Sequence, residues 1–311
     1  MEPLVILTGP TAVGKTGLSL KLAKEINAEI ISADSMQVYR HMDIGTAKIR
    51  PEEMQGIRHH LIDCMDPDED FNVTVFRSLA ETAVSEIRRR GKIPLVAGGT
   101  GFYIQALRKA VDFTSEECDN SYRLSLEELA RVEGPEILYR MLSEVDPDSL
   151  SVIHKNNVKR VIRALEYFHF HNRPISEHNR EEAGKKSVYR DAYFVLTSER
   201  EALYRRIDER VDRMMEEGLL SEVEELIRLG YGACPVSMQG LGYKQLLAYK
   251  KGNTELSEAV SEIKLQTRHF AKRQLTWFRR EEDAVFFDRS LKSDREILDE
   301  MLGILQEKGI I

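Results

Sequence analysis

The sequence has few cysteines, no long apolar run and no basic segment at its N-terminus. Its three cysteines, Cys64, Cys118 and Cys234, lie far apart and lack the spacing of metal ligands, so we expect reduced thiols. No run of about eighteen apolar residues is present, so we expect no membrane partner. The first residues lack the features of a secretion signal, which predicts a cytoplasmic location.

The sequence also lacks an excess of positive charge. Its net charge of −7 argues against a uniformly basic nucleic-acid-binding protein, because contacts with phosphates need Lys and Arg. The charge is uneven, however, since Arg268–Arg280 holds five Lys or Arg residues and no acid, and Asn156–Arg163 is also basic. A local surface that binds nucleic acid is therefore compatible with the negative net charge. The length of 311 residues predicts one large domain with an insertion, or two domains.

A phosphate-binding motif stands near the N-terminus. Residues 9–16 fit the pattern G-x-x-x-x-G-K-[ST] and lie between the apolar run Leu4–Leu7 and the helix-like Leu18–Ala23. In this motif backbone N–H groups and the lysine bind phosphate oxygens, and the threonine can ligate Mg²⁺. The motif therefore predicts a polyphosphate site with Mg²⁺ as cofactor on Thr16. We expect this site to comprise Gly9, Thr11, Ala12, Val13, Gly14, Lys15 and Thr16.

Strand-like and helix-like stretches alternate in the first third of the chain. The apolar runs Leu4–Leu7, Glu29–Asp34 and Ile93–Ala97 are each followed by a loop with polar or glycine residues. This alternation predicts an α/β fold with a parallel sheet, in which ligands bind at the carboxyl ends of the strands. Further strands are expected at Ala192–Thr197, Thr276–Phe278 and Ala284–Phe287, with a strand-like piece near Leu61–Ile62 and a helix at Val73–Arg90.

The alternation stops after the third strand. Helices are predicted at Ser121–Val132, Pro135–Val145 and Val158–Phe170, and Asp146 followed by proline predicts the start of a short helix between the last two. We therefore expect a helical insertion domain at 113–189 within an α/β core formed by 1–112 and 190–311.

Two long helices are predicted in the last third of the chain. The first, Arg200–Gly218, carries two stripes at helical spacing, namely apolar Leu203, Ile207, Val211 and Met214 beside basic Arg206, Arg210 and Arg213. Arginines one turn apart can bind one anion, but such a stripe can equally be a solvated face paired with Glu209 and Asp212. The second helix, Leu256–Gln274, carries Lys264, Arg268 and Lys272 on one outer stripe.

Asp34 ends an apolar strand near the phosphate motif. At this position it can hold Mg²⁺ or act as a general base, and a plain turn aspartate is the third interpretation. Gly98–Gly101 can present backbone N–H groups and the Thr100 hydroxyl to an anion or a carboxylate, although glycine turns follow many strands. His59 and His60 are adjacent on an extended segment, so their side chains point to opposite faces and a shared metal ion is disfavoured.

Several motifs follow one another along the chain: Gly9–Thr16, Ser32–Tyr39, Met42–Lys48, His59–Asp63, Gly98–Gly101, Arg163–Glu166 and Ala271–Arg279. In this set and order the chain resembles the bacterial tRNA dimethylallyltransferases (tRNA isopentenyltransferases) over essentially its whole length. The phosphate motif is widespread, whereas the middle and last motifs are specific to that family. Arg58 replaces a common proline, and Asn156–Asn157 replaces a common Asn-Asp. The resemblance implies a P-loop NTPase-like core with a helical insertion.

The resemblance implies transfer of a dimethylallyl group from dimethylallyl diphosphate to the exocyclic amine of the adenosine 3′-adjacent to the anticodon in tRNA, with release of diphosphate. By the family's pattern Asp34 accepts the proton of that amine, and Thr100 contacts Asp34 or the RNA. Lys15, Arg206, Arg210 and Mg²⁺ near Thr16 would stabilise the departing diphosphate, which the loop residues named above bind. The target adenine is expected to flip inward from its stack.

The resemblance also implies the tRNA anticodon stem-loop as the partner of a monomeric enzyme. The expected tRNA contacts, with Ser35 and Gln37 contacting the base, are Asp34, Ser35, Met36, Gln37, Thr100, Arg123, Asn156, Asn157, Arg160, Gly242, Lys244, Lys272, Arg273, Gln274 and Arg279.

Three alternatives stay open at this point: a nucleotide or small-molecule kinase that binds ATP, a nucleotide-gated RNA-binding switch, and an isopentenyltransferase acting on free adenine nucleotides. The basic Ala271–Arg279 segment together with Asp34–Gln37 disfavours the first two, because neither needs both features. The helical insertion disfavours the third.

Overall fold

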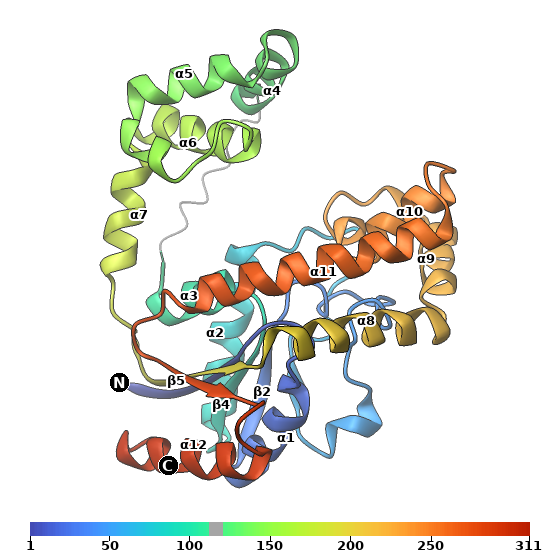
Figure 1. Ribbon diagram of the computed structural model, residues 1–311. Helices are drawn as coiled ribbons and strands as arrows, with labels where there is room; N and C mark the ends of the chain where they lie inside the picture. Colours follow the sequence, from blue (N-terminus) through green and yellow to red (C-terminus); the bar gives the residue numbers. More distant parts are fainter. Residues whose placement is uncertain (112–120) are drawn as a thin grey trace. The chain divides into compact units, whose positions relative to one another are not determined.

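The computed structural model describes residues 1–111 and 121–311 (Figure 1). These residues form two compact units, one of Met1–Ala110 with Ser187–Ile311 and one of Val111–Lys186. The expected insertion, 113–189, ends three residues beyond the second unit, and its first residue lies outside the described part of the chain, as does Cys118. No helix in the described ranges is both long and apolar enough to cross a membrane.

The first unit contains a parallel sheet, which confirms the predicted α/β fold. Its strand order, among the residues described, is β3-β2-β4-β1-β5-β6, and every neighbouring pair is parallel. The strands are β1 Glu2–Thr8, β2 Ala28–Ala33, β3 His59–His60, β4 Ile93–Gly98, β5 Tyr189–Thr197 and β6 Ala284–Asp288. The strand expected near Leu61–Ile62 therefore lies two residues earlier.

Helices cover both faces of the sheet because its central strands are apolar on both sides. In β1, Leu4 and Ile6 face one cluster of buried side chains, whereas Val5 and Leu7 face another. The first cluster includes α2 (Val73–Arg89) and α3 (Gly101–Lys109). The second includes α1 (Lys15–Glu25) and α12 (Asp294–Glu307). The sheet is thus the middle of three layers (Figure 1).

Two long helices, α8 (Arg200–Glu216) and α11 (Leu256–Phe278), lie side by side (Figure 1). The predicted apolar stripe of α8 is buried, which confirms the helix and its inward face. Lys264 and Arg268 of α11 form ion pairs with Asp212 and Asp208 of α8. Most of the predicted outer basic stripe of α11 is therefore neutralised, and Lys272 stays exposed.

One strand prediction is wrong. Residues Thr276–Phe278 continue α11 and do not form a strand. The reason is tertiary packing: Ala271, Gln274 and Phe278 are buried at helical spacing, and this outweighs the strand preference of Thr, Trp and Phe. The helices that were not predicted are α3, α7 (Ile175–Gly184), α9 (Leu219–Arg228) and α10 (Tyr243–Lys250).

The second unit is helical, as expected. It contains α4 (Ser121–Glu133), α5 (Pro135–Val145), α6 (Val158–His171) and α7, around a core that includes Leu126, Leu138, Leu142, Val161 and Leu165. Asp146 caps a short 3-10 helix, Pro147–Ser151, as predicted. The Asp146 carboxylate also accepts hydrogen bonds from the backbone and hydroxyl of Ser176, which fixes the start of α7.

A buried carboxylate forms ion pairs at the amino end of β2, which is the end of the strand remote from Asp34. Glu29, in β2, is 2% exposed. Its oxygens lie 2.8 Å from His60 Nε2, 2.8 Å from Arg90 Nη2 and 3.3 Å from Lys92 Nζ. Burial alone would raise the pKa of Glu29, but hydrogen bonds from Arg90, His60 and Lys92 lower it to about 2.

Acid is therefore expected to remove a contribution of Glu29 to stability. The folded-state pKa of about 2 lies below the ordinary 4.5, so the contribution is complete above pH 4.5 and is lost as the pH falls toward 2. Glu29→Gln should lower the free energy of unfolding at pH 7 by roughly 3 kcal/mol and flatten its decline in acid. Urea unfolding at several pH values tests this, with exposed Glu25→Gln in the same unit as control. An unchanged acid slope in Glu29→Gln would contradict it.

Candidate active site

The phosphate motif forms the loop between β1 and α1. β1 lies at a switch point of the sheet, because β4 and β2 follow it on one side and β5 and β6 on the other. Such a switch point at the carboxyl ends of parallel strands is where α/β folds bind ligands. Gly9 has φ of +147°, and an added Cβ would lie 2.5 Å from the carbonyl oxygen of Leu196. Only glycine fits there, so β5 and the loop can approach closely.

A first cavity of about 320 Å³ opens beside this loop. Its polar lining brings together the loop, the end of β2 and one face of α8. The predicted residues that line it are Thr11, Ala12, Gly14, Lys15, Thr16, Asp34, Gln37, Arg206, Arg210 and Gln274, and Arg213 lines it too. The arginine stripe of α8 thus faces the phosphate loop, which favours the anion-binding interpretation over a solvated face.

Within the described part of the chain, Lys15 and the three arginines of this cavity form no ion pair with a carboxylate, and Asp34 is the acidic side chain that shares the cavity with them. Arg206 Nε and Nη2 are buried and have no hydrogen-bond partner among the described residues. Burial, then Arg210, lowers the pKa of Lys15 to about 7, against the opposing effect of Asp34. Lys15 Nζ donates to the carbonyl oxygens of Gly9 and Pro10, each at 2.9 Å. A bound anion would satisfy Arg206 and favour the charged form of Lys15.

Asp34 directly follows β2 and lines the same cavity as the arginines. Its carboxylate accepts hydrogen bonds from the backbone N–H groups of Met36 at 2.9 Å and Gln37 at 3.4 Å. Gly98, at the end of β4, lies so close that an added Cβ would be 2.2 Å from the carbonyl oxygen of Ala33. The glycine loop after β4 therefore packs beside Asp34.

A second cavity, of about 420 Å³, is also lined by Asp34. It is lined by several apolar side chains, among them Val211, Met214 and Ile263. The predicted residues that line it, besides those shared with the first cavity, are Ser35, Met36, Thr100, Gly242 and Arg273. Both cavities are lined by Thr11, Asp34, Arg210, Phe270 and Gln274, which therefore mark their junction.

Known proteins resemble this chain closely. The model of the family described as IPP transferase matches residues 37–281, most of the chain. The chain belongs to the IPP transferase family. A model described as Isopentenyl transferase also matches residues 2–67. The family predicted from the motifs is thereby confirmed.

Relatives in this family match over the full length. A tRNA dimethylallyltransferase of Lachnoclostridium phytofermentans is 57% identical, covering 100% of both chains. One of Acetivibrio thermocellus is 46% identical, covering 100% of this chain and 99% of that protein.

Two solved structures are similar to the chain. A full-length tRNA isopentenylpyrophosphate transferase from Bacillus halodurans has a TM-score of 0.75 and 43% identity, covering 99% of this chain and 98% of its own. A eukaryotic dimethylallyltransferase described as acting on tRNA has a TM-score of 0.79 and 31% identity, covering 93% and 74%.

In this member of the IPP transferase family, two of the residues predicted to contact RNA also form hydrogen bonds within the protein. Gln274 Oε1 accepts from the N–H of Thr11, and its Nε2 donates to the carbonyl of Gly99, both at 2.9 Å. Gln274 thus ties the phosphate loop to the glycine loop. Gln37 Oε1 accepts from Ser32 Oγ at 3.1 Å, and its Nε2 donates to the carbonyl of Thr46 at 3.2 Å.

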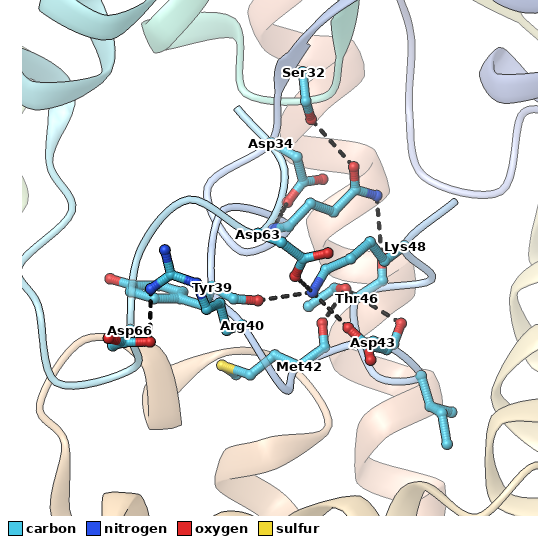
Figure 2. Close-up of polar contacts among 12 residues, drawn as sticks. Ser32, Asp34, Tyr39, Arg40, Met42, Asp43, Thr46, Lys48, Asp63 and Asp66 are labelled. Carbon is cyan, nitrogen blue, oxygen red and sulfur yellow. Dashed lines mark hydrogen bonds and ion pairs between the residues drawn. The ribbon is translucent and has the colours of Figure 1, made fainter. Parts of the chain in front are cut away.

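A buried lysine organises the loop between β2 and β3 (Figure 2). Lys48 Nζ donates to the carbonyl of Tyr39 at 2.7 Å and to the carboxylates of Asp43 and Asp63, each at 2.5 Å. Lys48 therefore joins the Met42–Lys48 motif to the His59–Asp63 motif. Both motifs are recognisable in the sequence, but no pattern there indicates the role of the lysine.

The remaining predicted residues lie outside the linings of the two cavities. Gly9 and Val13 contribute backbone groups, and Lys244, Lys272 and Arg279 are exposed on or beside α10 and α11. The helical unit holds exposed Asn156, Asn157 and Arg160, and its Arg123 forms a bidentate ion pair with buried Glu166.

Several residues at the site were missed. Arg289 Nη1 donates to the carbonyl of Val13 at 2.6 Å, and its position just after β6 at the carboxyl edge was a usable signal. Phe270 and Tyr243 were not among the predicted site residues, because no pattern in the sequence distinguishes them from other aromatic residues.

Proposed function

We propose that the chain transfers a dimethylallyl group from dimethylallyl diphosphate to the exocyclic amine of the adenosine 3′-adjacent to the anticodon in tRNA. The observation that carries this proposal is Asp34 at the junction of a cationic cavity and a more apolar one. The names of the full-length relatives support the same reaction. The proposal includes a monomeric enzyme in the cytoplasm.

The diphosphate is assigned to the first cavity. Lys15, Arg206 and Arg210 would bind its oxygens together with the N–H groups of the loop, and they would stabilise the charge that grows as the carbon–oxygen bond breaks. The hydroxyl of Thr16 is the kind of oxygen ligand that Mg²⁺ prefers, and Thr16 lines the same cavity as Lys15. Bound there, Mg²⁺ would supply further positive charge to the leaving group.

The acceptor adenine is assigned to the second cavity. The base must leave its stack to enter it, as in other enzymes that modify a nucleobase. The amine nitrogen forms a bond to the allylic carbon, the carbon–oxygen bond breaks, the diphosphate keeps the electron pair, and the Asp34 carboxylate takes the amine proton. Polar groups of Ser35 and Thr100 line this cavity and can contact the base.

One assay tests the function directly. The protein is incubated with unmodified tRNA, dimethylallyl diphosphate labelled in its carbon chain, and Mg²⁺, and label is sought in the RNA. Transfer to tRNA, with none to free adenosine monophosphate, is the expected result. Label transferred to the free nucleotide alone, or phosphoryl transfer from ATP without tRNA, would refute the proposal in favour of an alternative.

Phe270 is expected to limit the length of the prenyl chain. The five-carbon group must lie between the diphosphate and Asp34, and Phe270 is the apolar member of the residues shared by both cavities. Phe270→Ala should therefore raise kcat/KM for geranyl diphosphate relative to dimethylallyl diphosphate by roughly tenfold or more. Competition between the two donors measures the ratio, with exposed Leu265→Ala on the same helix as control. An unchanged ratio would remove this role.

The exposed end of α11 is expected to bind RNA phosphates. Lys272→Ala and Arg273→Ala should each weaken tRNA binding and reduce the slope of log affinity against log salt by about one. Fluorescence titrations at several salt concentrations measure this, and Arg295→Ala on α12 serves as control. Wild-type affinity and slope in both variants would show that tRNA binds elsewhere.

A further inference from the structure

One carboxylate of α9 holds three consecutive backbone N–H groups. Glu222 Oε2 accepts from the N–H of Asp43 at 2.8 Å and of Ile44 at 2.7 Å, and Oε1 accepts from the N–H of Gly45 at 3.1 Å. The hydroxyl of Tyr243, in α10, donates to Glu222 Oε1 at 2.6 Å. Four donors thus converge on a single side chain that is distant in sequence from the loop it holds.

Tyr243 also supports this loop by packing. It is 1% exposed, and an added Cβ on Gly45 would lie 2.6 Å from its ring. Burial, followed by the Glu222 charge, raises the pKa of Tyr243 well above its usual value, so the phenol stays protonated and keeps donating. Gly45 is therefore needed for the close contact between loop and ring.

The loop held in this way connects to the centre of the site. Its other end is fixed by Lys48, as Figure 2 shows. Gly45 and Thr46 line the second cavity. The carbonyl of Thr46 accepts from Gln37, whose backbone N–H donates to Asp34 at 3.4 Å. A chain of contacts thus runs from Glu222 through the loop to the turn that carries Asp34.

We propose that Glu222 and Tyr243 are positioning residues that hold the 43–46 loop, and through Gln37 the Asp34 turn, in the geometry needed for the acceptor adenosine. The assignment to the acceptor rests on the proposed function. Gly45 and Thr46 of the held loop line the second cavity, whereas Lys15, Thr16 and Arg206 of the diphosphate site do not contact Glu222. Loss of this support should therefore affect the tRNA substrate far more than the diphosphate substrate.

The test compares Glu222→Gln with Glu224→Gln on the same helix. Glutamine keeps the size of Glu222 but replaces one accepting oxygen with an N–H donor, which faces the donors of the loop. We expect Glu222→Gln to raise KM for tRNA and lower kcat, with a fall in kcat/KM of about thirtyfold. KM for dimethylallyl diphosphate should stay within about twofold. Tyr243→Phe, which keeps the ring, should show a smaller change in the same direction, and Glu222→Asp a partial recovery.

A second measurement does not depend on activity. Amide hydrogen exchange at residues 43–45 should speed up at least tenfold in Glu222→Gln and stay unchanged in Glu224→Gln. Unchanged exchange, or equal losses for both substrates, would overturn the proposal. If Glu222→Gln does not fold, Tyr243→Phe decides by the same two measurements. Absence of transfer by the wild type would instead refute the proposed function, while the exchange result would still report on the contacts.

Discussion

Replacing Asp34 with asparagine is expected to lower kcat for transfer to tRNA by about a thousandfold, within the range usual for loss of a general base. Asparagine keeps the oxygen that accepts the N–H of Met36, so the turn should persist. What it loses is the ability to take a proton from the adenine amine, whose lone pair is delocalised. Single-turnover transfer of labelled dimethylallyl groups to tRNA measures the effect on the chemical step.

Binding of the diphosphate substrate serves as the internal control for Asp34→Asn. Diphosphate affinity should be retained, because the groups assigned to that anion are Lys15, Arg206 and Arg210, and removing a nearby negative charge does not weaken it. Exposed Asp68→Asn should behave as wild type. If instead Asp34→Asn loses affinity for Mg²⁺, Asp34 is a metal ligand; if its turnover is unchanged, it is neither base nor ligand.

The sequence predicted the site residues best where a residue directly follows a strand of the sheet. The phosphate loop, Asp34 and Gly98 all follow apolar runs, and parallel strands bring such positions to one edge, so their proximity was predictable. The arginines of α8 were only half predictable. Helical spacing shows that Arg206, Arg210 and Arg213 share a face, but not what that face contacts. The structure answers this by placing the three beside Lys15.

Contacts with backbone groups could not be predicted. Gln274 joins two loops that are remote from it in sequence, and Glu222 binds N–H groups that every residue but proline possesses. No residue pattern encodes such partners, because the accepting or donating groups are the same at every position. The wrong strand prediction at Thr276–Phe278 has a related cause. The strand preference of these residues is visible in the sequence, whereas the burial of Phe278 in α11 depends on tertiary packing.

Lys15 is expected to take up a proton when the diphosphate substrate binds. Burial, then Arg210, lowers its pKa to about 7 in the free protein, against Asp34. Below pH 7 the amine is already charged, so binding changes nothing. Between pH 7 and about 10 the free amine is mostly neutral, and the bound diphosphate, by attracting the charged form, raises the pKa. Binding of dimethylallyl diphosphate at pH 8.5 should then take up nearly one proton.

Calorimetry in two buffers of different ionisation enthalpy measures this uptake. Lys15→Arg is the matched variant, because a guanidinium stays charged throughout this range and should show no uptake above pH 7. Lys15→Met should lower kcat by about a hundredfold to a thousandfold, as expected for loss of one group that stabilises the leaving charge. Equal proton uptake by wild type and Lys15→Arg would assign the titration to another group. Because the charge on Lys15 would arise mainly with substrate present, the free site avoids a further cation beside Arg206 and Arg210 and still presents one to the departing diphosphate.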